Sequence, residues 1–197
     1  MTMSKLILKE GHKVIAILAI ATIFSYLFIC DTFATIVLAA TLFSLYVFRT
    51  TNRHIFANTD NVLAPTDGKV IAIDKFENKQ KIYCKVNLCD SHVVKAPIDA
   101  QMKIKKQKHG LNLSPSSCKG KLLNEQVVIK FDNIKLKLIS GLCNISMEKL
   151  ESRDIIQGEN ICVFLDGIAE ITIKDNCDLL VNIGDKLTAG QTLLFKK

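Results

Sequence analysis

Residues 127–139 read Val-Val-Ile-Lys-Phe-Asp-Asn-Ile-Lys-Leu-Lys-Leu-Ile, and this stretch decides the fold class. Apolar residues stand on both sides of Asp132-Asn133, and lysines alternate with them as in a half-buried strand. Asp and Asn are common turn residues. The stretch therefore predicts two β-strands, Val127–Phe131 and Ile134–Ile139, separated by a turn.

The same alternation recurs through most of the chain after residue 58. Further strands are expected at Lys69–Ile73, Lys81–Val86, Met102–Lys106, Ala169–Ile173 and Thr192–Phe195. Residues 108–120 are rich in Ser, Pro, Gly and Lys and predict a long exposed loop, whereas residues 147–156 predict a short helix or an irregular loop. We expect a mostly β domain of the α+β class, built as two packed sheets or a barrel-like sandwich.

The first fifty residues have a different character. Two apolar runs, Val14–Cys30 and Phe33–Phe48, are separated by Asp31 and Thr32, and each is at the short limit for a helix that spans a bilayer. Lysines precede the first run and arginines follow the second, which fits a helical hairpin with both ends in the cytoplasm. We expect a membrane-anchoring hairpin over residues 1–53 and a β domain over residues 54–197. A re-entrant hairpin in one leaflet and a buried hairpin of a soluble protein are the alternatives.

Charge and composition indicate which classes of partner the chain can bind. The formal net charge is +7, but no Lys/Arg cluster is interleaved with aromatic residues and the chain has no tryptophan. This pattern favours an anionic membrane surface over nucleic acid, and we expect a location on the cytoplasmic side of the cell membrane. Cys89 and His92 have a ligand-like spacing, but no second ligand pair accompanies them, so no metal site is expected.

Several short motifs follow one another in a recognisable order. They are Phe48–Arg53, Pro65–Val70 (Pro-Thr-Asp-Gly-Lys-Val), Asp90–Pro97 (Asp-Ser-His-Val-Val-Lys-Ala-Pro), Asn124–Gln126, Ile139–Gly141 and the glycine-containing stretch Val181–Thr192. In this order, behind an apolar segment, they resemble the short bacterial phosphatidylserine decarboxylases. The resemblance covers nearly the whole chain, although each motif alone is weak.

The resemblance implies a chemistry and a set of residues. The family converts phosphatidylserine to phosphatidylethanolamine and carbon dioxide with a pyruvoyl group, which it makes from a serine of its own chain. By this resemblance His92 is the base and Asp67 orients it, in the manner of a Ser-His-Asp arrangement. Lys95 keeps the positive charge of a family arginine and is expected to bind the substrate.

The sequence departs from the family at the cleavage site. The matching stretch is Gly158–Ile173, and a forward count from Gly158 places Gly167 on the family glycine and Ile168 on the serine. A backward count from Gly184 places Asp166 on the glycine and Gly167 on the serine, and we prefer it because a slip of one residue would turn the strand side chains to the wrong face. Neither Gly167 nor Ile168 carries a nucleophile. We therefore expect that the pyruvoyl group is not formed.

These observations predict a phosphatidylserine decarboxylase-related protein of phospholipid biosynthesis, whose own catalysis is in question. Its expected partners are membrane phospholipid at the inner membrane and either a second copy of itself or an active paralogue. A non-catalytic lipid-binding or regulatory relative is one alternative. A membrane-anchored adaptor with a biotinyl/lipoyl-like fold is another, because Pro65–Val70 and Val181–Gln191 look like the paired turns of that fold.

Overall fold

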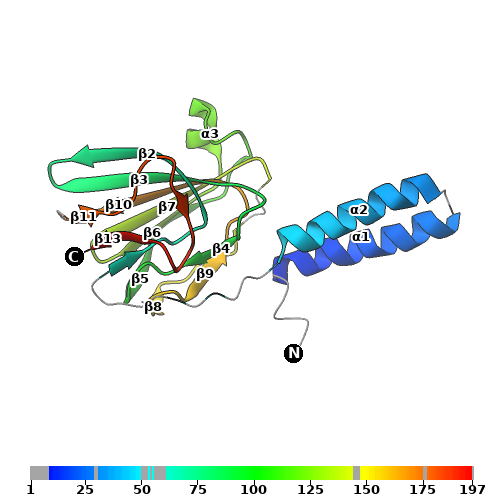
Figure 1. Cartoon of the computed structure of the whole chain (residues 1–197), viewed down its shortest axis with the longest axis horizontal. Coiled ribbons are helices and arrows are strands. Elements are labelled where there is room, and N and C mark those ends of the chain that lie inside the picture. Colours follow the sequence, from blue (N-terminus) through cyan, green and yellow to red (C-terminus); the bar gives the residue numbers. More distant parts are fainter. Residues whose placement is uncertain are drawn as a thin grey trace. The chain divides into compact units, whose positions relative to one another are not determined.

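A computed structural model describes residues 9–28, 31–49, 53, 55, 61–143, 147–174 and 177–196. The chain divides into two compact units, Met1–Asn52 and Arg53–Lys197 (Figure 1). The first unit is helical and the second is built mainly from strands.

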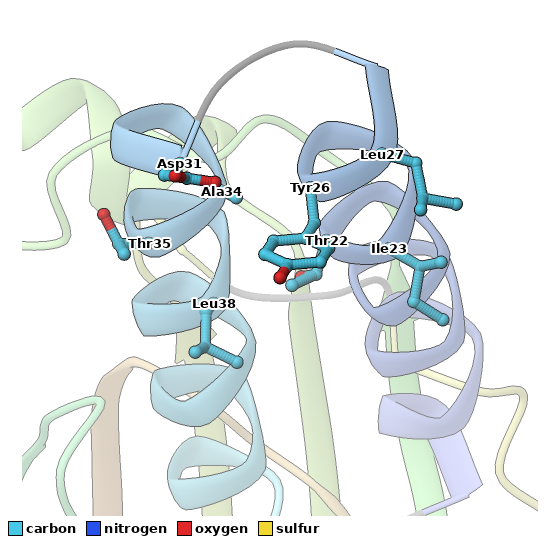
Figure 2. Close-up of a pocket in the computed structure, with 8 residues that line it drawn as sticks. All are labelled: Thr22, Ile23, Tyr26, Leu27, Asp31, Ala34, Thr35 and Leu38. Carbon is cyan, nitrogen blue, oxygen red and sulfur yellow. The ribbon is translucent and has the colours of Figure 1, made fainter.

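The N-terminal unit contains two antiparallel helices, α1 (Lys9–Phe28) and α2 (Asp31–Val47). The hydroxyl oxygens of Thr22 and Thr41 are 3.1 Å apart and join the helices by a hydrogen bond. Figure 2 shows a pocket between them, to which α1 contributes Tyr26 and α2 contributes Asp31 and Leu38. Among the described residues, no helix has both the length and the apolar character needed to cross a membrane.

The second unit contains a short helix, α3 (Cys118–Leu123), and a series of strands. The strands are β1 Asn61–Leu63, β2 Gly68–Phe76, β3 Lys79–Val86, β4 Val93–Lys95, β5 Ala100–Lys108, β6 Gln126–Phe131, β7 Ile134–Ser140, β8 Arg153–Ile155, β9 Asn160–Val163, β10 Gly167–Ile173, β11 Asp178–Leu179, β12 Lys186–Leu187 and β13 Leu193–Lys196. Every strand predicted from the sequence is found, which confirms the mostly β, α+β assignment.

The described strands form one large sheet and two small ones. The eight-stranded sheet has the order β12-β2-β3-β10-β7-β6-β5-β8, the three-stranded sheet has the order β1-β13-β11, and β4 pairs with β9. The hairpin of β6 and β7 closes over the predicted turn, with Phe131 opposite Ile134. Asp132 adopts a φ of 35° there, a conformation that Asp tolerates better than most residues and that two-residue hairpin turns require.

The small sheets cover one face of the large sheet and share its core. Alternate residues of β10, namely Ala169, Ile171 and Ile173, are fully buried and pack with residues of β1, β4 and β13, including Val62, Val94 and Phe195. Burial of such apolar side chains is the main stabilising contribution to the domain. This two-layer packing is the predicted sandwich.

Two segments differ in detail from the sequence-based expectation. Residues 147–156, expected to be a helix or an irregular loop, contain strand β8, which pairs with the edge strand β5. The expected loop at residues 108–120 is mostly irregular, but its last residues begin α3. Ser117 caps this helix by accepting a hydrogen bond from Gly120 N at 2.9 Å, as serines directly before a helix commonly do.

Candidate functional site

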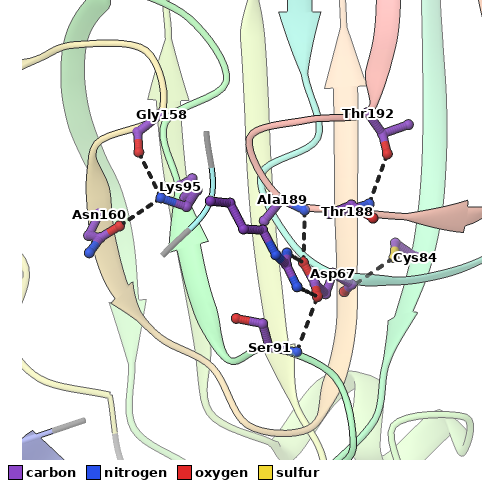
Figure 3. A network of polar contacts seen from close by, with 10 residues as sticks. Asp67, Cys84, Ser91, Lys95, Gly158, Asn160, Thr188, Ala189 and Thr192 are labelled. Carbon is purple, nitrogen blue, oxygen red and sulfur yellow. Dashed lines mark hydrogen bonds and ion pairs between the residues drawn. The ribbon is translucent and has the colours of Figure 1, made fainter. Parts of the chain in front are cut away.

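Asp67 lies in the turn between β1 and β2 and is the centre of a polar network (Figure 3). Arg53 donates two hydrogen bonds to its carboxylate, at 2.5 and 2.7 Å, in the bidentate geometry that favours arginine over lysine. The backbone N–H groups of Ser91 and Ala189 donate two more, at 3.2 and 2.8 Å. The carboxylate thus ties together the segment at Arg53, the turn before β4 and the turn before β13.

These contacts determine the charge of Asp67. Burial alone would raise the pKa of the carboxyl group, since it disfavours the charged form. Arg53 opposes this effect through its hydrogen bonds and its positive charge, and the N–H groups of Ala189 and Ser91 oppose it as well. Together these contacts outweigh burial and hold the pKa of Asp67 below its ordinary value. Asp67 is therefore an anion at neutral pH.

His92 precedes β4 and its side chain is almost completely buried, with 1% exposed. Its backbone carbonyl accepts a hydrogen bond from Phe164 N at 2.8 Å, and the next residue, Val93, pairs with Val163 of β9. Phe164 lies two residues before Asp166. The β4–β9 pairing therefore brings His92 beside the stretch that the sequence predicts to be the cleavage site.

The structure connects Asp67 to His92 through the backbone. The carboxylate of Asp67 binds the N–H of Ser91, the residue directly before His92, so Asp67 fixes the start of the segment that carries the histidine. The predicted contact between the carboxylate and the imidazole ring, with His92 as base, remains a prediction.

Lys95, the predicted substrate-binding residue, lies at the other end of β4. Its ammonium group donates hydrogen bonds to the carbonyl of Gly158 and to the side chain of Asn160, both at 3.1 Å. Burial and the nearby charge of Arg53 lower the pKa of Lys95, while Asp67 opposes them. Lys95 is thus close enough to Asp67 and Arg53 to interact electrostatically, but its head group is held by β9 and the turn before it.

Residues 166–168, predicted from the sequence to be a degenerate cleavage site, lie at the start of β10. Gly167 opens β10 with a φ of 145°, and a Cβ atom at this position would lie 2.1 Å from the carbonyl oxygen of Ile139. Only glycine fits this backbone conformation, since both the torsion and the space exclude a side chain. The carbonyl of Asp166 accepts a hydrogen bond from Gly141 N at 2.8 Å, which holds the connection against the end of β7.

The geometry around Gly167 can be compared with the forward and backward counts of the sequence analysis. The burial of Ala169, Ile171 and Ile173 confirms that these residues share the core face, which was the reason for preferring the backward count. The conformation of Gly167, however, suits a glycine, as the forward count requires, and that count places Ile168 at the serine position. The choice between the counts stays a prediction, and under both of them the nucleophile is missing.

Other residues with a hydroxyl or thiol group lie near this stretch, but they differ from the family serine in their position, burial or protonation. Ser140 of β7 pairs directly with Gly167 and is fully buried. Cys84 lies beneath Asp67, and burial raises the pKa of its thiol to about 12, so it is protonated at neutral pH. Cys162 belongs to β9, where it pairs with Val94.

Two residues with polar contacts in the structure were not assigned from the sequence. Arg53 ends the Phe48–Arg53 motif, but a motif gives no indication that its last residue reaches Asp67. Glu125 is buried and accepts hydrogen bonds from His109 at 3.0 Å and from Met147 N at 3.2 Å, which anchors the segment that follows β7. The signal for Glu125 was its place in the motif Asn124–Gln126.

Among the described residues, no group of three or more His, Cys, Asp or Glu side chains is placed to hold a metal ion.

Comparison with known proteins agrees with the family that the motifs suggested. The model of the phosphatidylserine decarboxylase family matches residues 40–195. A phosphatidylserine decarboxylase proenzyme of Pelagibacter ubique is 31% identical over 207 residues, which cover 95% of both chains. The corresponding proenzyme of Desulfotalea psychrophila is 28% identical, with 94% of each chain covered. No solved structure shows significant similarity to the chain. The match over most of the chain establishes that this protein belongs to the phosphatidylserine decarboxylase family.

Proposed function

We propose that this protein is a member of the family that does not form its own pyruvoyl group and acts as a non-catalytic, lipid-binding relative. Its ligand class is a phospholipid with a serine headgroup, the substrate named for its relatives. It would serve phospholipid biosynthesis by binding this lipid or by pairing with an active paralogue.

The observation that carries the proposal is the state of the cleavage site. Formation of a pyruvoyl group requires a serine whose hydroxyl attacks the preceding carbonyl and then leaves from Cβ. Gly167 has no Cβ and no room for one, and Ile168 has only a hydrocarbon side chain. Asp67 and His92 are nevertheless present, and the backbone of His92 is hydrogen-bonded to Phe164, two residues before Asp166. A binding role can use these residues, whereas self-cleavage cannot proceed without the hydroxyl group.

A membrane location is supported by the surface of the N-terminal unit. Apolar side chains are exposed along both helices, for example Ile17, Ile20 and Leu27 of α1 and Ile36 and Leu42 of α2. A patch of this kind is costly in water and favourable in the acyl region of a bilayer. We therefore propose that the helical hairpin anchors the protein in the membrane on the cytoplasmic side.

A decarboxylation assay tests the proposed function. The full-length protein in detergent micelles is supplied with phosphatidylserine that is isotopically labelled in the serine carboxyl group. We expect no release of labelled carbon dioxide above that from micelles without protein, and binding of the lipid measured in parallel by co-elution. Enzymatic release of carbon dioxide, abolished by His92→Ala, would overturn the proposal.

A further inference from the structure

An exposed apolar patch surrounds α3. Leu122 and Leu123 of this helix are 70% and 45% exposed, and Leu111 in the preceding loop is 55% exposed. Leu111 N donates a hydrogen bond to the carbonyl of Leu123 at 2.9 Å, so the loop and the helix lie against each other. Leu142, which follows β7, is 62% exposed. We refer to these four leucines as the α3 patch.

The fourth leucine belongs to the same region because β7 ends beside α3. The side chain of Asn124, directly after Leu123, donates a hydrogen bond to the carbonyl of Ser140 at 2.7 Å. Leu142 follows Ser140 by two residues. The intervening Gly141 donates to the carbonyl of Asp166, so the α3 patch extends to the degenerate cleavage site.

Positive charge accompanies the α3 patch. Residues 108–123 contain three lysines and one histidine but no aspartate or glutamate. Lys119 and Lys121 of α3 are exposed, and the ammonium group of Lys108 donates to the carbonyl of Leu122 at 2.9 Å. Exposed leucines with lysines beside them match the interfacial region of an anionic bilayer, where apolar groups enter the acyl boundary and cations meet phosphate.

The α3 patch lies at the same end of the large sheet as the candidate site. Gly167 and Ser140 form the same end of the large sheet as Gln126, the first residue of β6 after α3. The turns that join β2 to β3 and β6 to β7 lie at the opposite end of the strands. We propose that the α3 patch docks this end of the β domain onto an anionic phospholipid bilayer, with the site around His92 facing the lipid headgroups. This docking adds to the proposed function and can be tested without measuring that function.

Tryptophan fluorescence offers a direct test, because the natural chain has no tryptophan. The full-length variant Leu122→Trp, incorporated into vesicles of phosphatidylglycerol and phosphatidylcholine, has a single reporter in the α3 patch. We expect a blue-shifted emission and quenching by roughly half with brominated acyl chains, since interfacial side chains lie about 5–10 Å into the headgroup boundary. The substitutions Lys119→Glu and Lys121→Glu in this variant should reduce the quenching.

The matched control is Phe76→Trp. Phe76 is 52% exposed at the opposite end of the sheet, and the ammonium group of Lys79 lies 4.6 Å from its ring, so size, exposure and neighbouring charge are similar. We expect its emission to be unaffected by brominated lipid, although both variants have the same helical hairpin. Equal quenching of the two variants, or no quenching of Leu122→Trp and of the second reporter Leu142→Trp, would overturn the proposal.

Discussion

At the scale of residues, the ion pair of Asp67 and Arg53 connects the site to the start of the β domain. A buried carboxylate is stable only when its charge is compensated, and Asp67 has four hydrogen bonds from three segments of the chain. The pair therefore holds the turns before β4 and β13 in place. Its role is structural as well as electrostatic, because the same contacts fix the segment that carries His92.

The variant Asp67→Asn tests the ion pair. It removes the carboxylate that pairs with the guanidinium of Arg53, and we expect the free energy of unfolding to fall by about 3 kcal/mol at neutral pH. Urea denaturation followed by circular dichroism measures the change. The control Asp178→Asn alters an exposed aspartate of β11 and should change stability by less than about 0.5 kcal/mol. A similar effect of both substitutions would contradict this role for Asp67.

The pH dependence of stability follows from the pKa of Asp67. The folded-state pKa lies below the ordinary value of 3.8, so the ionised carboxylate stabilises the protein fully above that pH. As the pH falls through the folded-state pKa, this stabilisation is lost. The difference in unfolding free energy between the natural protein and Asp67→Asn should therefore shrink below about pH 3.8. Urea titrations at neutral and acid pH compare the two proteins, and a constant difference would contradict the assignment.

Ser140 offers a second prediction at this scale. Among the described residues no hydrogen-bond partner is found for its hydroxyl oxygen, although the side chain is fully buried. Burying a polar group without a partner is unfavourable, so Ser140→Ala should raise the free energy of unfolding by about 1 kcal/mol. Ser117→Ala is the contrasting control, because it removes the cap of α3 and should cost about 1 kcal/mol. Loss of stability in Ser140→Ala would show that the hydroxyl has a partner.

At the scale of elements, the start of β10 determines what the cleavage site can do. Gly167 pairs with Val86 on one side and Ser140 on the other, at the centre of the eight-stranded sheet. Its backbone conformation allows the strand to approach the carbonyl of Ile139. In this chain, the strand predicted to contain the cleavage site begins with a residue that has no room for a side chain.

Alanine substitution of two glycines tests this constraint. Gly167→Ala places a Cβ against the carbonyl of Ile139 and should lower the free energy of unfolding by about 3 kcal/mol or more. Gly184→Ala is the matched control, because Gly184 also has a positive φ, of 99°, but nothing lies within 4 Å of the added atom. Backbone strain alone should cost about 1–2 kcal/mol there. Thermal or urea unfolding compares them, and equal losses would mean that the space at Gly167 is not restrictive.

The strands and their faces could be predicted from the sequence because burial imposes a period of two on each of them. Ala169, Ile171 and Ile173 show this pattern clearly, and the turn at Asp132 was equally evident. Strands β1, β4, β8, β9, β11 and β12 were not predicted, since they have only two to four residues and pair only through tertiary contacts. The contact of Arg53 with Asp67 depends on how the chain enters the domain, and no local pattern in the sequence specifies it.

At the scale of the whole molecule, the chain combines a helical unit with exposed apolar side chains and a basic β domain with a retained but incomplete site. The net charge of +7 and the α3 patch favour contact with anionic lipid, while the site has Asp67 and His92 without the serine. These properties together fit a family member that works at a membrane as one continuous chain.

The most direct test of this account is the intact mass of the full-length protein, purified under denaturing conditions. The account predicts one uncut chain of 21.9 kDa with unmodified termini. Two fragments that meet near residues 166–168, with the C-terminal fragment blocked by a pyruvoyl group, would contradict it.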